Sequence, residues 1–213
     1  MISIEKFVFS PFQENTYILW DKVTKEAAIV DPGCMEESER KILKDFIDTS
    51  EISVKYLINT HCHIDHIFGN AFVKRSYNPT FYAPEKDVFL LDLMMKQAEE
   101  YGVELEKSPI PDYFLTEDLH LFLGEEEMSF IFTPGHSPGE YCIYLRNSEI
   151  CISGDVLFLE GIGRTDLWGG DTRTLIQSIK FKLFLLPDET LVYPGHGDST
   201  TIGHEKRNNP FLF

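Results

Sequence analysis

The sequence of 213 residues is poor in cysteine, and its cysteines are not paired along the chain. The four cysteines stand far apart and form no Cys-x-x-Cys motif: Cys34, Cys62, Cys142 and Cys151. Small disulfide-stapled proteins and zinc ribbons need closely spaced cysteines, so this spacing excludes both frameworks. We therefore expect reduced thiols.

Basic residues are also scarce. Lys and Arg together number 19 against 35 Asp and Glu, which gives a formal net charge of −16. Nucleic-acid binding depends on cationic side chains that neutralise phosphates. The composition thus predicts no nucleic-acid partner, and the acidic surface is interpreted as an aid to solubility.

Long apolar runs are missing as well. No stretch approaches the ~20 consecutive apolar residues that a membrane-spanning helix requires. Residues 1–7 carry neither the basic segment nor the apolar segment of a signal peptide. We expect no membrane attachment and a cytoplasmic protein.

What the chain does contain is typical of one globular α/β domain over residues 1–213, with 43% apolar and 25% charged residues. Segments rich in Ile, Val, Tyr and Phe predict strands. They cover residues 2–10, 16–20, 27–31, 54–59, 119–123, 128–133, 141–145, 150–153 and 191–193. Predicted helices cover residues 36–48, 84–101 and 172–186, the last with Asp171 as its N-cap. Strands in runs separated by helices indicate a layered α/β protein.

The predicted helix over residues 84–101 is apolar around much of its circumference. A stripe at helical spacing passes through Val88, Leu91, Met95 and Ala98. Burial in the core, coverage of a pocket and contact with a second subunit all remain open for this helix. The oligomeric state does not follow from the sequence.

The densest cluster of chemically active residues is His61, His63, Asp65 and His66, within six consecutive positions. It directly follows a strand-like apolar run. Alternation along an extended chain places His61 and His63 on one side. A turn into a helix after Asp65 brings the remaining pair toward the same point. Imidazole and carboxylate donors suit zinc, iron or manganese, so the cluster predicts a metal site.

Three more donors come later in the chain, namely His136, Asp155 and His196. Each lies in a glycine- or proline-rich turn that follows an apolar stretch. A glycine permits the tight backbone geometry with which such a turn presents a side chain. The repeated pattern predicts that these residues join the metal site.

The pattern His61-x-His63-x-Asp65-His66, followed by His136, Asp155 and His196, resembles the signature of the metallo-β-lactamase-fold hydrolases. The resemblance covers residues 15–213 and implies an αββα sandwich of two mixed sheets flanked by helices. It also implies two metal sites, one made by His61, His63 and His136, the other by Asp65, His66 and His196, with Asp155 bridging them.

This resemblance implies two divalent ions, with zinc the first choice and iron or manganese as alternatives. Together with Asp65, Asp155 and a bridging hydroxide, such a centre keeps a charge of about +1. Metal-bound water has a pKa of about 7, so hydroxide between the ions can attack a carbonyl without a Ser or Cys nucleophile. Asp65 and Asp155 are therefore predicted to be catalytic carboxylates as well as ligands.

Within the superfamily the chain looks like the glyoxalase II branch, especially its short bacterial members. The matching segments are residues 15–17, 30–33, 161–166 and 205–211. This implies hydrolysis of a small-molecule thioester, hydroxyacylglutathione of the S-lactoylglutathione type. The branch places a cation facing the substrate carboxylate at Arg164, although pairing with Asp166 or Asp171 is the alternative. Asp31 is predicted to accept a hydrogen bond from a ligating imidazole, with a simple turn aspartate as the alternative.

One departure affects the substrate. Full-length glyoxalase II has a helical C-terminal domain that supplies much of the glutathione site, whereas this sequence ends soon after His196. We therefore expect weak or altered glutathione recognition, or another thiol carrier.

The chain is also similar to the persulfide dioxygenases of the same fold, which hold a single iron on two histidines and a carboxylate. The corresponding set is His61, His136 and Asp155. Hydrolysis is favoured because the chain retains the remaining donors. Nucleases of the superfamily are disfavoured by the acidic charge and true β-lactamases by the missing export signal. An inert metal-stabilised module is disfavoured because such sites usually contain cysteine ligands.

Overall fold

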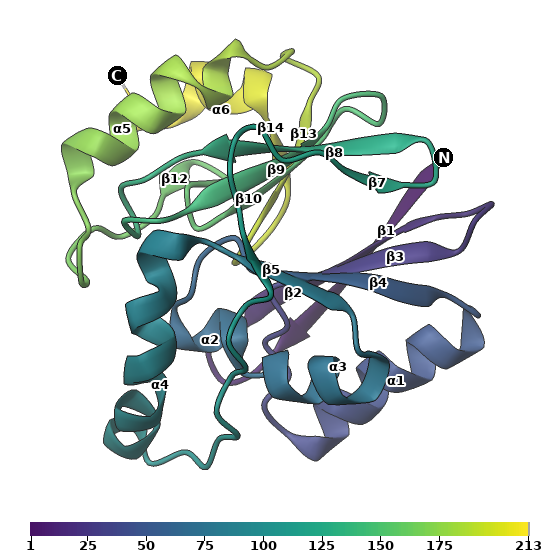
Figure 1. Cartoon of the computed structure of the whole chain (residues 1–213). Helices are drawn as coiled ribbons and strands as arrows, with labels where there is room; N and C mark the ends of the chain where they lie inside the picture. The colour runs from purple at the N-terminus through teal and green to yellow at the C-terminus, as the bar shows by residue number, and fades with distance from the viewer. Residues whose placement is uncertain (213) are drawn as a thin grey trace. The chain divides into compact units, whose positions relative to one another are not determined.

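The structure is a computed structural model that describes residues 1–212, and its chain divides into two compact units (Figure 1). The first unit contains Met1–Phe114 and Leu123–Glu125. The second unit contains Leu115–Phe122 and the chain from Glu126 onward. A single domain over residues 1–213 stays a prediction.

The first unit is built on a six-stranded mixed sheet. Its strands, in spatial as well as chain order, are β1 (Ile2–Phe9), β2 (Glu14–Asp21), β3 (Glu26–Val30), β4 (Ser53–Ile58), β5 (Thr80–Ala83) and β6 (Tyr113–Phe114). The strands from β1 to β3 pair antiparallel, and those from β3 to β6 pair parallel. Carboxyl ends of parallel strands meet at one edge of a sheet, so the segments that follow β3 and β4 begin side by side.

Helices of the first unit are α1 (Glu37–Thr49), α2 (Ile64–Ile67), α3 (Asn70–Tyr77) and α4 (Val88–Tyr101), the last preceded by a 3₁₀ turn, η1 (Glu85–Asp87). Figure 1 shows α1 and α3 along one face of the sheet. Leu43 and Ile47 of α1, Val73 of α3 and Met94 of α4 join one apolar core with Leu57 of β4. Full burial of each such side chain stabilises the fold by about 1.5–3 kcal/mol.

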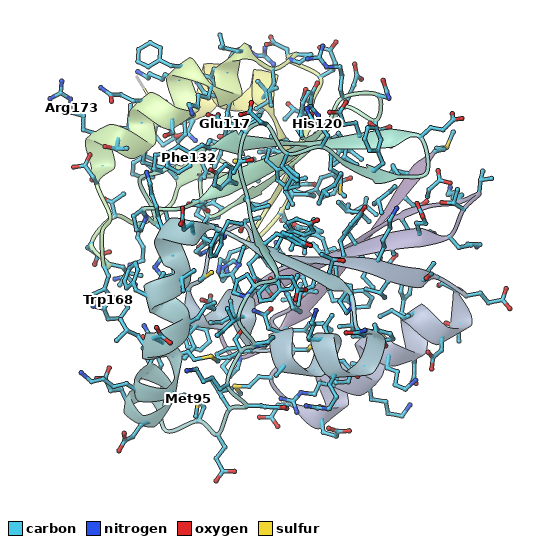
Figure 2. The ribbon with its side chains drawn as sticks, viewed as in Figure 1. Met95, Glu117, His120, Phe132, Trp168 and Arg173 are labelled. Atoms are coloured by element: carbon cyan, nitrogen blue, oxygen red, sulfur yellow. The ribbon has the colours of Figure 1, made fainter. Side chains whose placement is uncertain are left out.

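Helix α4 buries part of the apolar stripe seen in the sequence. Its buried face contains Leu90, Leu91, Met94 and Ala98, whereas Met95 is 43% exposed and projects from the lower end of the helix in Figure 2. The stripe is thus buried at Leu91 and Ala98 and exposed at Met95, because apolar residues surround this helix and spacing alone does not identify the core-facing side.

The second unit is built on another mixed sheet, in the order β14-β13-β10-β9-β8-β7. These strands are β7 (Leu121–Leu123), β8 (Glu126–Phe132), β9 (Tyr141–Leu145), β10 (Ile150–Gly154), β13 (Leu191–Pro194) and β14 (Thr200–Thr201). A small antiparallel hairpin pairs β11 (Leu157–Phe158) with β12 (Gly161–Ile162). Helices α5 (Thr172–Phe181) and α6 (Ile202–Asn208) and the 3₁₀ turn η2 (Leu183–Leu185) complete this unit.

Helix α5 begins where the sequence predicts it. The Asp171 side chain accepts a hydrogen bond of 2.7 Å from Thr174 N, which confirms the N-cap. Leu175 and Ile179 are fully buried against the sheet. The helix ends at Phe181, earlier than predicted, because Lys182 leaves the helical conformation with φ of −126° and ψ of −62°. The chain continues as η2 and becomes extended at Leu186, which precedes a proline.

The predicted α/β class with two mixed sheets and accompanying helices is confirmed. Several short elements escaped prediction, among them α3, β5, the β11–β12 hairpin and α6. Within residues 1–212, no helix combines the length and apolar character needed to cross a membrane.

All four cysteines are free and buried. Burial raises the pKa of the Cys34 thiol to about 12. It also raises the pKa of Cys62 and Cys142 well above the ordinary value. Cys62, which stands between two proposed ligands in the sequence, lies in the apolar core of the first unit.

Candidate metal centre

In the first unit the ends of β3 and β4 are joined through Asp31. This residue directly follows β3 in a left-handed conformation, with φ of 48°, and its backbone N–H donates to the Ile58 carbonyl. Its carboxylate accepts hydrogen bonds from Thr60 N at 2.8 Å and from Thr60 Oγ1 at 2.6 Å. Asp31 therefore holds the start of the histidine-rich loop in place.

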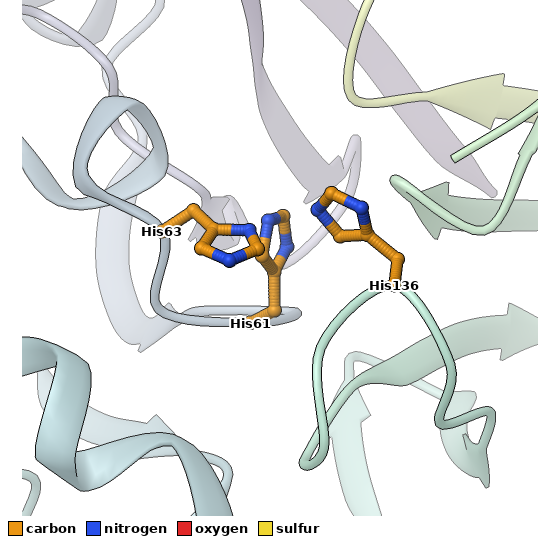
Figure 3. Close-up of side chains that lie close together, drawn as sticks. All are labelled: His61, His63 and His136. Atoms are coloured by element: carbon orange, nitrogen blue, oxygen red, sulfur yellow. The ribbon is translucent and has the colours of Figure 1, made fainter. Parts of the chain in front are cut away.

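The four donors of this loop converge. The His61 ring centroid lies 4.8 Å from that of His63 and 4.1 Å from that of His66. His66 Nε2 lies 3.7 Å from Asp65 Oδ2. His61 and His66 are fully buried, and Figure 3 shows the rings of His61 and His63 on their shared loop. The first unit thus gathers three imidazoles and a carboxylate from one short segment.

The two ring nitrogens of His66 face different carboxylates. Nδ1 lies 3.3 Å from Asp31 Oδ2, whereas Nε2 points to Asp65. Asp31, His61 and His66 each offer a ligand atom, and these atoms lie within 4.8 Å of one another. The position of Asp31 at Nδ1 fits the predicted role of orienting a ligating imidazole, which stays a prediction.

Buried polar residues that sequence reasoning missed support this loop. The Asp87 carboxylate accepts a hydrogen bond from Cys62 N at 3.3 Å, and Asn59 Nδ2 donates to the His66 carbonyl at 3.0 Å. Glu14 is fully buried beside His66, and burial raises the pKa of its carboxyl well above the ordinary value. Asn59 adjoins the motif and was recognisable, whereas nothing in the sequence marks the distant Asp87 or Glu14.

In the second unit the donors come from three separate turns at one edge of the sheet. His136 follows β8, Asp155 follows β10 and His196 follows β13. β10 and β13 run parallel, and Gly195 N donates to the Gly154 carbonyl at 2.7 Å just before the latter two donors. Strand register therefore brings residues that are far apart in sequence to the same place.

Asp155 stands between the two imidazoles of this unit. Its Oδ2 atom lies 3.5 Å from His136 Nε2 and 3.7 Å from His196 Nε2. Figure 3 shows His136 at the tip of its own loop. Asp155 N donates a hydrogen bond of 2.8 Å to Glu140 Oε1, which fixes the backbone at the carboxylate. Glu140 is fully buried and was not predicted, because it follows the recognised turn without a motif of its own.

The hydrogen bonds of His136 define which nitrogen is available to a metal. Nδ1 lies 2.7 Å from the Arg164 carbonyl, and a carbonyl only accepts, so Nδ1 carries the proton. In the neutral ring Nε2 then presents a lone pair toward the Asp155 carboxylate. Two acceptor atoms that face each other fit a cation between them, and the donor set therefore fits a divalent metal.

Close packing explains two glycines in these turns. Gly135 has φ of 140°, and a Cβ there would lie 2.3 Å from Leu175 N in α5. At Gly163 a Cβ would lie 1.9 Å from the Asp155 carbonyl oxygen and 3.0 Å from His136 Cβ. Both positions require glycine so that the backbone can approach the ligand turns.

Arg164, the predicted substrate residue, lies beside the proposed ligands but pairs with Asp166. Its Nε and Nη2 atoms donate to the two carboxylate oxygens, each at 2.7 Å. This hydrogen-bonded pair lowers the pKa of Asp166 to about 2. Asp171 caps α5 instead. The side chain of Arg164 is 63% exposed, so its guanidinium is accessible to solvent.

The two histidines without a predicted ligand role lie on the surface. His120 pairs with Glu127, and Figure 2 shows it at the sheet of the second unit. His204 Nε2 lies 3.0 Å from Glu160 Oε1. Neither belongs to a group of potential metal ligands among residues 1–212.

Comparison with known proteins agrees with this chemistry. The family model described as the metallo-beta-lactamase superfamily matches residues 9–196. The hydroxyacylglutathione hydrolase GloC of Haemophilus influenzae is 38% identical over 213 residues, which is 99% of this chain and 98% of the relative.

Two solved structures are similar over nearly the whole chain. The BLEG-1 B3 metallo-beta-lactamase superposes with a TM-score of 0.89 at 34% identity and covers 99% of each chain. TTHA1623, solved in a di-iron-bound form, superposes with a TM-score of 0.86 at 33% identity, covering 98% of this chain and 100% of its own. Donor chemistry, sequence and fold agree, and the chain belongs to the metallo-beta-lactamase superfamily.

Proposed function

We propose that this chain is a binuclear metal-dependent hydrolase that cleaves a thioester, with hydroxyacylglutathione as substrate. Its superfamily and its relatives already identify a metallo-hydrolase. The finer activity is supported by the 38% identical relative, which is named a hydroxyacylglutathione hydrolase. The proposed ligands are His61, His63 and His136 for one ion, Asp65, His66 and His196 for the other, and Asp155 for both.

One observation carries this proposal. In each unit an imidazole Nε2 atom faces a carboxylate oxygen at a distance of 3.5–3.7 Å. For His136 the facing atoms are a nitrogen lone pair and a carboxylate oxygen, because its Nδ1 carries the proton. Such an approach between two acceptor atoms is favourable when a cation lies between them. Nitrogen and oxygen donors without cysteine favour a catalytic over a structural metal site.

Two bound divalent ions would supply a water acidified to a pKa near 7 and a Lewis acid for the scissile carbonyl. The reaction adds water to a thioester and yields a carboxylic acid and a thiol, so it needs no oxidant. A thiolate with an ordinary pKa near 8.5 leaves without a general acid. This favours a thioester over an amide, whose amine leaving group needs a proton.

Arg164 supplies the proposed recognition of substrate. Its guanidinium already binds the Asp166 carboxylate through bidentate hydrogen bonds. Both side chains are more than 60% exposed, so a substrate carboxylate can replace Asp166 at little cost. Glutathione carries carboxylates that suit this exchange.

We further propose zinc as the resident metal, with iron as the alternative supported by the di-iron form of TTHA1623. The net charge of −16 supports a small-molecule substrate rather than nucleic acid. The family model spans both units, which supports a single functional domain. We place the protein in the cytoplasm, where glutathione thioesters form.

The test begins with purified protein and metal analysis. Thiol release from S-lactoylglutathione is then measured beside oxygen uptake with glutathione persulfide and opening of a chromogenic cephalosporin. We expect close to two metal equivalents and thiol release that a chelator abolishes. Arg164→Ala should raise KM for the thioester with a smaller effect on kcat, since it acts in binding.

Two results would contradict the proposal. One equivalent of iron with oxygen uptake and no hydrolysis would identify a persulfide dioxygenase that uses His61, His136 and Asp155. Cephalosporin opening at a kcat/KM above that for the thioester would identify a β-lactamase instead.

A further inference from the structure

Helix α6 carries a buried carboxylate that no predicted role explains. Glu205 is fully buried and accepts three hydrogen bonds. Thr200 Oγ1 donates at 2.6 Å, Asn209 Nδ2 at 2.8 Å and the backbone N–H of Glu160 at 3.0 Å. The last bond reaches the turn of the β11–β12 hairpin, 45 positions earlier in the chain.

Asn209, the C-cap of α6, completes the same network. Its Nδ2 group also donates to the Gly161 carbonyl at 3.0 Å, and its Oδ1 atom accepts from Phe211 N at 3.1 Å. Both amide hydrogens and the amide oxygen are thus engaged in a fully buried side chain. Glu205 and Asn209, which we name the α6 latch, bind backbone groups of two consecutive hairpin residues, Glu160 and Gly161.

The hairpin turn needs such support. Glu160 has φ of 54°, a left-handed conformation that costs a non-glycine residue about 1 kcal/mol or more. The latch binds the N–H of this residue and the carbonyl of the next. A strained conformation persists only where surrounding contacts stabilise it, and the α6 latch supplies such contacts to Glu160.

The hairpin in turn contacts the proposed ligands of the second unit. The Phe158 ring meets the His196 ring edge-on, with centroids 6.5 Å apart. Immediately after β12, Gly163 packs against Asp155, and the Arg164 carbonyl accepts the Nδ1 proton of His136. The hairpin and the segment that follows it therefore contact all three proposed ligands of this unit.

We propose that Glu205 and Asn209 are positioning residues that hold the β11–β12 hairpin, and through it orient His136, His196 and Arg164 for metal and substrate. The part that concerns metal and substrate rests on the proposed function. The part that concerns the hairpin does not, because it follows from contacts within the second unit.

Asn209→Asp tests the latch, because it replaces the amide donor with a carboxylate opposite Glu205. Asn208→Asp is the matched control: it makes the same chemical change one residue earlier, where Nδ2 donates to the His204 carbonyl on the exposed side of α6. Hydrogen exchange of residues 157–164 in the metal-free protein should quicken on the order of tenfold in Asn209→Asp alone. Zinc affinity, measured against a chromophoric chelator, should fall on the order of tenfold in the same variant.

Glu205 provides a second test by conservative rescue. In Glu205→Gln, Oε1 can accept from Asn209 and Glu160 while Nε2 donates to the Thr200 hydroxyl, so zinc affinity should stay within twofold. Glu205→Ala should reproduce the effects of Asn209→Asp. If Asn209→Asp does not fold, Asn209→Ala removes the donor without adding charge and serves in its place.

A lower melting temperature with unchanged hairpin exchange and zinc affinity would assign the network to general stability and overturn the proposal. Equal behaviour of the Asn208 and Asn209 variants would do the same. Failure of the proposed function is distinguishable, since wild-type protein would then bind metal without releasing thiol while hairpin exchange still responds to Asn209→Asp.

Discussion

The two units assemble their proposed ligands in opposite ways. The first unit takes four donors from one segment, residues 61–66, whose geometry is set by neighbours along the chain and by Asp31. The second unit takes His136, Asp155 and His196 from three turns that only strand register and the hairpin bring together. The first set thus owes its spacing to one short segment, although distant residues such as Asp31 and Asp87 support that segment. The second set owes its spacing to contacts between separate segments.

The two units also differ in the surroundings of their ligand carboxylates. Asp155 Oδ2 approaches two imidazoles of its own unit. In the proposed function Asp155 binds both ions, whereas Asp65 binds one. The second unit thus combines donors from separate segments with the carboxylate that is proposed to bind both ions. Four experiments test this difference between the two units.

The largest effect is expected from Asp155→Asn. Because Asp155 links two imidazoles, kcat/KM for thioester hydrolysis should fall about a thousandfold, and the loss for Asp65→Asn should be about tenfold smaller. Steady-state kinetics with metal analysis of both variants measures the ratio. Equal losses would mean that the two carboxylates contribute alike and would remove the contrast.

Removal of metal should destabilise the protein and loosen the units unequally. Loss of tightly bound ions should lower the melting temperature by roughly 10 °C. Hydrogen exchange should rise more in residues 133–137 and 194–197 than in residues 60–66, since the latter segment keeps its hydrogen bonds to Asp31. A uniform rise across the three segments would contradict the distinction between local and distant support.

Gly135→Ala should destabilise the second unit by about 3 kcal/mol, through a positive φ and a Cβ that overlaps the α5 backbone. The matched change in the first unit is Gly102→Ala, where φ is 68° and no atom lies within 4 Å. That variant should lose only about 1 kcal/mol. Urea unfolding at equal metal occupancy measures both, and a Gly135 loss no greater than that at Gly102 would show that α5 moves aside.

The smallest effect concerns the Arg164–Asp166 pair. Its hydrogen bonds lower the pKa of Asp166 to about 2 from an ordinary value near 3.8. Because the folded-state pKa is depressed, the pair stabilises fully above pH 3.8 and loses this contribution as the pH falls through about 2. In Arg164→Ala the carboxyl should titrate near its ordinary value by ¹³C NMR; an unchanged midpoint would exclude Arg164 as the cause.

The contrast also explains what the sequence could predict. His61, His63, Asp65 and His66 were recognisable because a strand followed by a tight turn converts short spacing directly into proximity. The turns with His136, Asp155 and His196 were recognisable only by their glycines and by family resemblance. Their mutual distances depend on the register of β10 against β13, which no local pattern encodes.

Supporting residues were the least predictable. Asp87 and Glu205 are buried acids that bond backbone groups 25 and 45 positions away, and sequence shows neither their burial nor their partners. The core-facing side of α4 could not be identified from the sequence for a related reason, since apolar residues surround that helix. The prediction of the long β-strands and of the capped α5 was correct because their sequence signals are local.

The inaccessible sulfur atoms matter for an enzyme whose proposed product is itself a sulfur nucleophile. Mixed-disulfide exchange needs an ionised, reachable cysteine, and Cys34, Cys62 and Cys142 are shielded from solvent with elevated pKa values. Glutathione liberated in successive turnovers would then find nothing on the chain to couple with, even when its oxidised form accumulates. If the proposed function holds, burial of these cysteines would protect the chain from mixed-disulfide formation with its own product.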